Sequence, residues 1–262
     1  GALDGAALVV TTVVGAGIFT VPAYVASLAG GAAATLGLWI AGGLLALAGS
    51  LCYAELGARV PRGGAEYAYL RAAFGEPLAF LSGWTSFVAG FSGAIAAAAV
   101  GFAVYLAGVV PAIAQLTVGV LRVGPITIAL TGTTMTALAL IAVFTLVSVS
   151  GVRASRATTN ALAVLIVVGI VTIAVAGFTG NAAPSAPLAK VGGSAWSALV
   201  PIFFTYSGWN AAAYVAGEFR NPATAIPRAL AGGTLVVLLL YLAITAALLR
   251  ALSRGGLAAA GA

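Results

Sequence analysis

Long stretches without a charged residue alternate with short charged segments along this chain. The uncharged stretches cover residues 5–54, 77–121, 123–152, 157–189, 191–217 and 229–249. A membrane hydrocarbon core of about 30 Å requires roughly 20 helical residues, so the first two stretches have room for more than one crossing each and the others hold one. Helices are the expected crossing element, because lipid offers the backbone no partners and no strand-like alternation over about ten residues occurs.

This pattern predicts seven transmembrane helices. They are placed at residues 7–28, 33–55, 78–108, 127–149, 158–179, 195–217 and 229–250. Segment 57–77 differs from them, because Arg, Glu and Tyr recur in a short amphipathic pattern that is typical of an interfacial helix. The prediction is therefore one all-α polytopic transmembrane domain over residues 1–262, with one segment lying on the membrane surface.

Composition agrees with a location in lipid. Hydrophobic residues make up 62% of the chain, charged residues only 6%, and the mean hydropathy is +1.16. The formal net charge is +6, but the arginines lie in short loops and not along one basic face, which argues against a nucleic-acid partner. The sequence contains no nucleophile–base pair, metal-ligand cluster or phosphate loop, so it predicts neither an enzyme nor a cofactor.

Basic residues are unevenly divided between alternate loops. One side receives Arg59, Arg62, Arg71, Arg153, Arg156, Arg220 and Arg228, and the other receives Arg122, Lys190, Arg250 and Arg254. The positive-inside rule therefore predicts a cytoplasmic N-terminus. The excess of arginine over lysine is typical of GC-rich bacterial genomes, so we expect the bacterial cytoplasmic membrane. An odd number of helices and a Gly/Ala-rich tail favour truncation in an outer loop.

The first predicted helix carries residues that weaken a helix at its centre. Gly15 and Gly17 flank Ala16, and Pro22 follows one turn later. Each glycine costs about 1 kcal/mol relative to alanine, and proline removes a hydrogen-bond donor. If the chain unwinds there, the amides near Ala16, Gly17 and Ile18 become donors at a helix N-terminus, which suits a carboxylate.

The sixth predicted helix has a comparable weak point at Ser207 and Gly208, with aromatic residues on both sides. Unwinding there would expose backbone carbonyls that suit an ammonium group, so the two breaks together would match the two ends of an amino acid. Small residues also occur where membrane helices simply pack closely, and either break alone fits that alternative as well. Breaks in the first and sixth helices, as an inverted repeat of five helices requires, favour a binding site.

Several motifs recur here in a familiar order. They are residues 15–19 (GAGIF), 53–57 (YAELG) continuing through 61–70 (PRGGAEYAYL), 83–84 (GW), 151–153 (GVR), 206–210 (YSGWN), 218–222 (EFRNP) and 226–228 (IPR). Over its whole length the chain thus resembles permeases of the amino acid-polyamine-organocation superfamily, in the branch similar to LAT-type exchangers. The resemblance implies a partial LeuT-type fold: the first five-helix repeat plus two helices of its inverted partner, with helices 1 and 6 broken at mid-membrane.

The resemblance also implies roles for the residues of the breaks. The amides of Ala16 and Gly17 would hold the substrate carboxylate, and Thr12 would face the same pocket. The carbonyls of Phe204 and Ser207 would accept the α-ammonium group. The complete candidate set for substrate binding is Thr12, Gly15, Ala16, Gly17, Ile18, Phe204, Ser207, Gly208 and Asn210.

Aromatic and amide side chains of the second break have more open roles. By resemblance, Phe204 would be a gate that closes over the substrate. Asn210 would support the unwound segment or touch the substrate. For Trp209, a gating role and a role in packing or interfacial anchoring are both open.

The sequence departs from many relatives in the fifth helix. Six residues after Asn160, where they have a lysine that stands in for a sodium ion, this chain has Ile166. No ionisable residue is expected at mid-depth in any helix, so the sequence does not identify a coupling ion, either proton or sodium. Exchange without a coupling ion, and coupling through further helices, both stay open. Glu55 and Glu218, at cytoplasmic helix ends, are read either as salt-bridged gate elements or as plain interfacial residues.

The sequence therefore predicts amino acid transport by alternating access. The lack of acidic side chains disfavours cationic substrates, although a polyamine or amine transporter of the same superfamily remains an alternative. A non-transporting fragment of a permease is another. A membrane enzyme or channel would need ionisable residues facing a cavity or a polar stripe along one helix, and the sequence shows neither.

Overall fold

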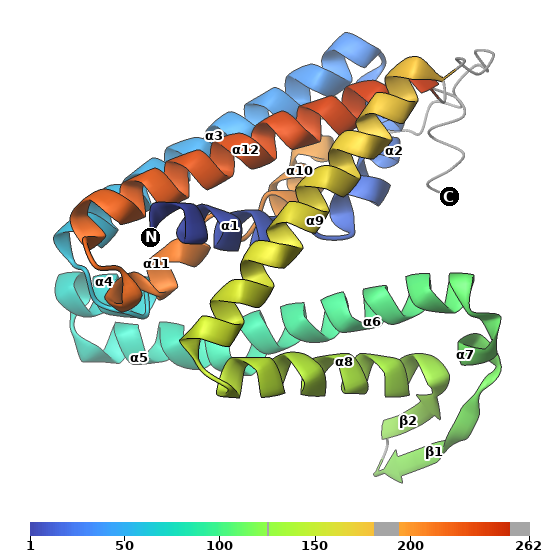
Figure 1. Ribbon diagram of the computed structural model, residues 1–262, viewed down its shortest axis with the longest axis horizontal. Helices are drawn as coiled ribbons and strands as arrows, with labels where there is room; N and C mark the ends of the chain where they lie inside the picture. Colours follow the sequence, from blue (N-terminus) through green and yellow to red (C-terminus); the bar gives the residue numbers. More distant parts are fainter. Residues whose placement is uncertain (125, 181–193, 252–262) are drawn as a thin grey trace. The chain divides into compact units, whose positions relative to one another are not determined.

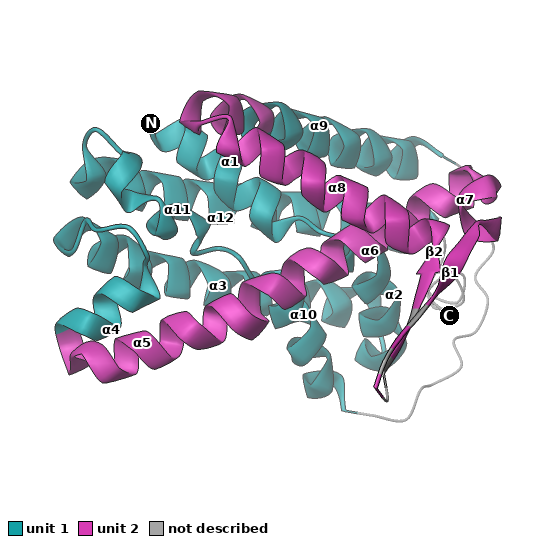
Figure 2. Cartoon of the chain, turned by 90° about the horizontal axis from the view of Figure 1, so that it is seen from below, with its two compact units in different colours: residues 1–72, 159–262 teal, residues 73–158 magenta. Residues whose placement is uncertain are grey.

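The computed structural model describes residues 1–124, 126–180 and 194–251, and these are predominantly helical (Figure 1). The chain divides into two compact units (Figure 2). Unit 1 comprises residues 1–72 and 159–262, and unit 2 comprises residues 73–158. Each unit is described on its own below.

Unit 1 contains the two ends of the chain and both predicted breaks. Its helices are α1 (Ala2–Val13), α2 (Gly17–Ala29), α3 (Ala32–Arg59), most of α4 (Glu66–Phe74), most of α9 (Val152–Thr179), η2 (Ala195–Ala198), α10 (Leu199–Thr205), α11 (Ala211–Tyr214), η3 (Ala216–Glu218) and α12 (Pro222–Ala251). Helix α12 packs along α3 and α1, and Figure 1 shows α3 and α12 running side by side. The hydrophobic core of the unit lies among these helices.

Unit 2 contains a long apolar helix that folds back through a hairpin. Helix α5 (Glu76–Thr85), the π-helical turn η1 (Ser86–Phe91) and α6 (Ser92–Val109) follow without interruption. After α7 (Pro111–Gln115), the antiparallel strands β1 (Thr117–Val123) and β2 (Ile126–Thr131) lead into α8 (Gly132–Val149), which packs against α6.

The hairpin changes one predicted boundary. The helix expected from residue 127 begins at Gly132, because residues 127–131 belong to β2. The physical reason is local: residues 126–128 are all β-branched, which favours a strand, and Thr131 ends it by capping α8. The Thr131 hydroxyl oxygen accepts a hydrogen bond from the Thr134 amide at 3.3 Å.

Five helices of the described residues are long and apolar enough to cross a membrane, or six when the bent pair α1 and α2 counts as one. This confirms the prediction of a helical polytopic membrane protein and is consistent with part of a LeuT-type fold. The segment expected as one helix over residues 195–217 is instead divided into η2, α10, α11 and the start of η3.

Glycines on one face of α3 allow its close approach to the second break and to α12. A Cβ atom added at Gly43 would lie 2.8 Å from the Tyr206 hydroxyl oxygen and would overlap Leu238, and one added at Gly42 would overlap Ile202. Trp39, one turn earlier on the same helix, is fully buried against Tyr206. The absence of side chains at these glycines therefore sets how closely α3 packs against α10 and α12.

The substitution Gly43→Ala tests this packing. We expect a loss of about 1–3 kcal/mol in the free energy of unfolding, because the added methyl group overpacks a buried contact. The control is Gly37→Ala on the same helix, where an added Cβ meets nothing within 4 Å. Thermal unfolding of both variants in detergent measures the difference, and equal midpoints would contradict the packing argument.

Candidate functional site

The first break separates α1 from α2. Helix α1 ends at Val13, α2 begins at Gly17, and the two axes differ by 56°. The first backbone hydrogen bond of α2 runs from the Phe19 amide to the Ala16 carbonyl at 3.1 Å. No carbonyl of the described residues accepts from the amides of Ala16, Gly17 or Ile18, so these groups are donors at a helix N-terminus.

The second break separates α10 from α11. Helix α10 ends at Thr205, α11 begins at Ala211, and between them Gly208 adopts a φ of 100°, which is unfavourable for any residue with a side chain. The Phe204 carbonyl already accepts two hydrogen bonds, from the Ser207 amide at 3.1 Å and from the Ser207 hydroxyl at 2.7 Å. Within the described ranges, the Ser207 carbonyl has no donor.

The two breaks lie against each other. A Cβ atom added at Gly208 would be 3.1 Å from the carbonyl oxygen of Thr12, near the end of α1. One added at Gly17 would be 3.0 Å from the Thr205 side-chain oxygen, at the end of α10. The fold therefore packs the end of α1 and the start of α2 against the second break, although the breaks are far apart in the sequence.

The remaining candidate residues differ in exposure. Thr12, Gly15, Ala16 and Ser207 are exposed, whereas the side chain of Ile18 is fully buried and leaves only its backbone for binding. The Phe204 side chain, the predicted gate, is 83% exposed. Apart from Phe204, the exposed candidates are therefore small residues.

Trp209 and Asn210 turn toward other parts of unit 1. The Trp209 ring packs edge-on against Tyr53 of α3, with ring centroids 5.0 Å apart, and also lies against Gly49. These contacts are those of a packing residue. The Asn210 side-chain amide donates to the Glu66 carboxylate and to the Tyr214 hydroxyl, the latter at 3.3 Å.

Glu66 is a functional candidate that the sequence analysis missed. Its Oε1 atom accepts hydrogen bonds from Asn210 and from the Tyr53 hydroxyl at 3.0 Å, and Tyr214 hydrogen bonds to the same carboxylate. Gly64, two residues earlier, donates its amide to the Tyr214 carbonyl at 3.1 Å. The start of α4 is thereby connected to α11. The only signal in the sequence was the carboxylate inside the motif of residues 61–70.

A buried tyrosine beside Glu66 stays neutral. Burial, and then the nearby Glu66 carboxylate, raise the pKa of Tyr69 to about 12. The Tyr69 hydroxyl thus keeps its proton over the physiological pH range.

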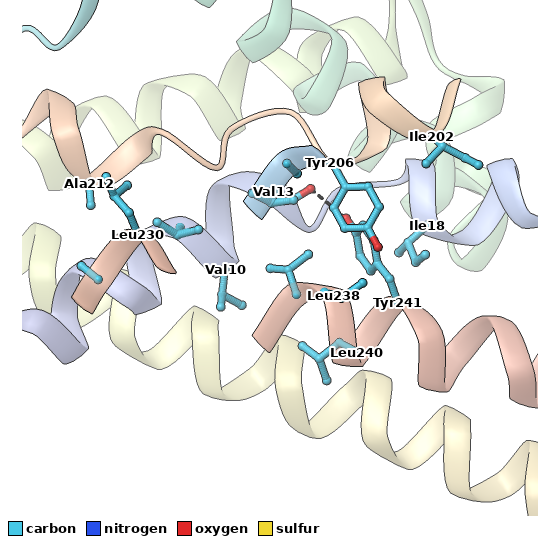
Figure 3. Close-up of a cluster of buried hydrophobic side chains, with 14 of the residues drawn as sticks. Val10, Val13, Ile18, Ile202, Tyr206, Ala212, Leu230, Leu238, Leu240 and Tyr241 are labelled. Atoms are coloured by element: carbon cyan, nitrogen blue, oxygen red, sulfur yellow. Dashed lines mark hydrogen bonds between the residues drawn. The ribbon is translucent and has the colours of Figure 1, made fainter. Parts of the chain in front are cut away.

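Tyr241 of α12 is a second residue that the sequence analysis missed. Its hydroxyl lies 3.0 Å from the Val13 carbonyl oxygen and 3.1 Å from that of Thr205, the last residues of α1 and α10. Figure 3 marks its hydrogen bond to Val13. In the sequence, Tyr241 is only a tyrosine at the centre of an otherwise apolar run, and such a pattern predicts a core residue.

The predicted ionisable residues at helix ends have modest contacts. Arg59 pairs with Glu55 at 2.6 Å, but both side chains are more than half exposed, so this pair contributes little stability. Glu218 is exposed at the end of η3. In α9, the Asn160 side-chain amide donates to the Asp4 carboxylate of α1 at 2.8 Å, and Ile166 packs against the core.

Comparison with known proteins identifies a family. The model of a family described as "Amino acid permease" matches residues 1–261. The chain is similar to the "Serine/threonine exchanger SteT" of Bacillus subtilis (strain 168), with 30% identity over 263 aligned residues that cover 97% of this chain and 55% of that protein. The chain thus spans about half the length of this relative.

Two mammalian relatives match over shorter regions. The "b(0,+)-type amino acid transporter 1" of Mus musculus is 42% identical over 88 residues, which are 34% of this chain and 18% of that protein. The human "Asc-type amino acid transporter 1" is 33% identical over 106 residues, which are 40% of this chain and 20% of that protein. All three relatives are named as exchangers or transporters and not as enzymes.

Replacing Gly208 tests the contact between the breaks. We expect Gly208→Ala to destabilise the fold by about 1–3 kcal/mol, because the residue is in the left-handed region and its new methyl group would press on Thr12. Gly232→Ala in α12, where an added Cβ meets nothing within 4 Å, serves as control. Thermal unfolding in detergent compares them, and a Gly208 variant as stable as its control would refute the contact.

Replacing Glu66 tests its connection to α11. Glu66→Ala should cost about 2 kcal/mol, because Tyr53 and Asn210 lose their common acceptor, whereas Glu66→Gln keeps one acceptor oxygen and should cost less. Glu55→Ala removes an equally charged but exposed side chain and should change stability by less than about 1 kcal/mol. The order of the three unfolding midpoints is the readout, and a Glu66→Ala midpoint equal to that of Glu55→Ala would argue against the connection.

Proposed function

This chain belongs to the amino acid permease family, and we propose that the permease transports amino acids across a membrane by binding them at the two breaks. One observation carries the proposal: the start of α2, whose amides are free, packs against the second break, where the Ser207 carbonyl is free among the described residues. A zwitterion needs donors for its carboxylate and acceptors for its ammonium group, and this arrangement offers both through backbone groups.

The carboxylate would bind at the amides of Ala16, Gly17 and Ile18, with Gly15 and Thr12 beside it. These amides lie at the N-terminus of α2, a helix of thirteen residues, so the positive end of the helix dipole faces the carboxylate. Ala16 is exposed and Gly17 is partly exposed, which leaves the approach open. These backbone donors would be the first half of the site.

The ammonium group would bind at carbonyls of the second break. Ser207 is the preferred acceptor in this conformation, because the Phe204 carbonyl is already occupied by two hydrogen bonds from Ser207. Phe204 would act as the gate, since its exposed ring is free to close over the substrate. Gly208 gives the chain the turn that this arrangement needs, and Asn210 would support it through Glu66.

Transport would follow an alternating-access mechanism. The helices that carry the breaks would rock against the rest of the protein once Phe204 has closed over the substrate. Trp209 would move with them, as a residue that packs beside the gate. We propose the bacterial cytoplasmic membrane as location with the N-terminus in the cytoplasm, supported by the loop arginines and by a bacterial relative. No coupling ion is assigned, and exchange of one amino acid for another fits the naming of that relative as an exchanger.

A ligand panel tests the two-ended site. The full-length protein is expected to bind a subset of amino acids, and to lose that binding when either the carboxylate is amidated or the amino group is acetylated. Gly17→Leu should abolish binding, because its side chain would press on Thr205 and cover the amides. The control Gly37→Leu places the same side chain where an added Cβ meets nothing within 4 Å and should bind normally.

The panel also separates the alternatives. Binding of amines that lack a carboxylate, with no loss on amidation, would replace this proposal by an amine or polyamine transporter. Binding of no ligand by a well-folded protein would favour a non-transporting fragment. Radiolabelled ligands in a scintillation proximity assay give the dissociation constants.

A further inference from the structure

The Tyr241 hydroxyl occupies the point where two helices end. Its oxygen is hydrogen-bonded to the carbonyl of Val13 at 3.0 Å (Figure 3). It also lies 3.1 Å from the carbonyl of Thr205. Val13 is the last residue of α1 and Thr205 is the last residue of α10, so this single side chain contacts the start of both breaks. Tyr241 itself lies near the centre of α12 and is fully buried.

These two carbonyls depend on Tyr241. Carbonyls in the last turn of a helix have no amide of their own helix to accept from, and inside a protein they need another donor. In the part of the chain that the structure describes, no other group donates to Val13 or Thr205 carbonyl oxygens. The single phenolic proton is therefore shared by two buried acceptors, which draws both helix ends toward one atom.

The Tyr241 ring is held rigidly by two other buried aromatic residues. Its centroid is 5.0 Å from that of Tyr206 and 5.6 Å from that of Trp39, and both neighbours are buried. The Tyr206 hydroxyl donates in turn to the Trp39 carbonyl at 3.2 Å. Because α3 and α12 supply two of the three rings, the hydroxyl is fixed to the long helices and not to the breaks.

Half-helix ends in broken-helix transporters commonly coordinate the coupling cation with their carbonyls. Here a side-chain proton from α12 satisfies the two converging carbonyls. The position of this hydroxyl group is set by α12 and by the packing of its ring.

We propose that Tyr241 is a positioning residue that holds the ends of α1 and α10 together and thereby sets the separation of the two halves of the substrate site. The proposal rests on the proposed function above. The amides that would bind the carboxylate begin three residues after Val13, and the carbonyl that would bind the ammonium lies two residues after Thr205. Losing the hydroxyl would let both ends move while leaving every proposed substrate contact chemically intact.

A pair of matched variants tests this role. Tyr241→Phe and Tyr206→Phe each remove one hydroxyl from the same buried aromatic cluster. Tyr241→Phe leaves the Val13 and Thr205 carbonyls without their donor, whereas Tyr206→Phe removes one hydrogen bond to the Trp39 carbonyl inside α3. Among the described residues, the Tyr206 hydroxyl donates to Trp39 and lies near Gly43, both in α3. That variant therefore reports the structural cost of losing a buried hydroxyl that does not bond to the end of α1 or of α10. We measure the dissociation constant of a bound amino acid and the unfolding midpoint for both variants and the wild type.

We expect both variants to lose stability and only Tyr241→Phe to lose affinity, by about tenfold, which corresponds to about 1.4 kcal/mol. A Tyr241→Phe affinity within about twofold of the Tyr206→Phe affinity would overturn the proposal. If the wild type binds no amino acid, the proposed function fails instead, so the two failures are distinguishable.

A second variant keeps the test valid if Tyr241→Phe does not fold. Incorporation of 3-fluorotyrosine at position 241 keeps the ring and hydroxyl but makes the phenol a stronger hydrogen-bond donor. We expect a lower dissociation constant than in the wild type, because the helix ends are held more firmly. An unchanged dissociation constant would count against the proposal, since a merely structural ring does not sense donor strength.

Discussion

The ends of α1 and α10 are buried inside this protein, and their terminal carbonyls must find partners without the help of water. The carbonyl ends of α1 and α10 meet at the Tyr241 hydroxyl. The amide end of α2 has no acceptor among the described residues, and the carbonyl of Ser207 has no donor there. One pair of unsatisfied helix ends is thus closed by a side chain, while the other pair remains available. Backbone groups that must be satisfied somewhere are natural binding groups for a ligand.

The elements around the breaks hold them in place through different kinds of contact. Tyr206 packs closely against glycines of α3, and Gly208, in the left-handed conformation, lies against Thr12. Close packing therefore sets one part of the geometry of the breaks. Glu66 sets another part, because it connects the start of α4 to α11 through Asn210. Membrane helices gain little from burying apolar surface against each other, so small residues and polar contacts must supply their specificity. The second break has both small residues and polar contacts.

The candidate site could be anticipated in part. Gly15, Gly17 and Gly208 stand out in the sequence because glycine weakens a helix. In the structure Gly15 lies between α1 and α2, Gly17 begins α2, and Gly208 lies between α10 and α11. The hairpin before α8 was not anticipated, since its β-branched residues are as apolar as those of the helix that follows. Nor was Glu66 assigned a role, because its partners Tyr53 and Asn210 are distant in sequence and only the fold brings them together.

The sequence by itself determined that this chain is a helical membrane protein, because the length and polarity of its apolar stretches leave no other way to satisfy the backbone in lipid. It also determined where helices weaken, since glycine and proline act locally. Only the tertiary structure decided which weak points meet, and which buried hydroxyl and carboxylate hold them. Tyr241 looks like core in the sequence, and its role arises because α12 passes the ends of both α1 and α10. Contacts between distant segments depend on packing, which no local pattern encodes.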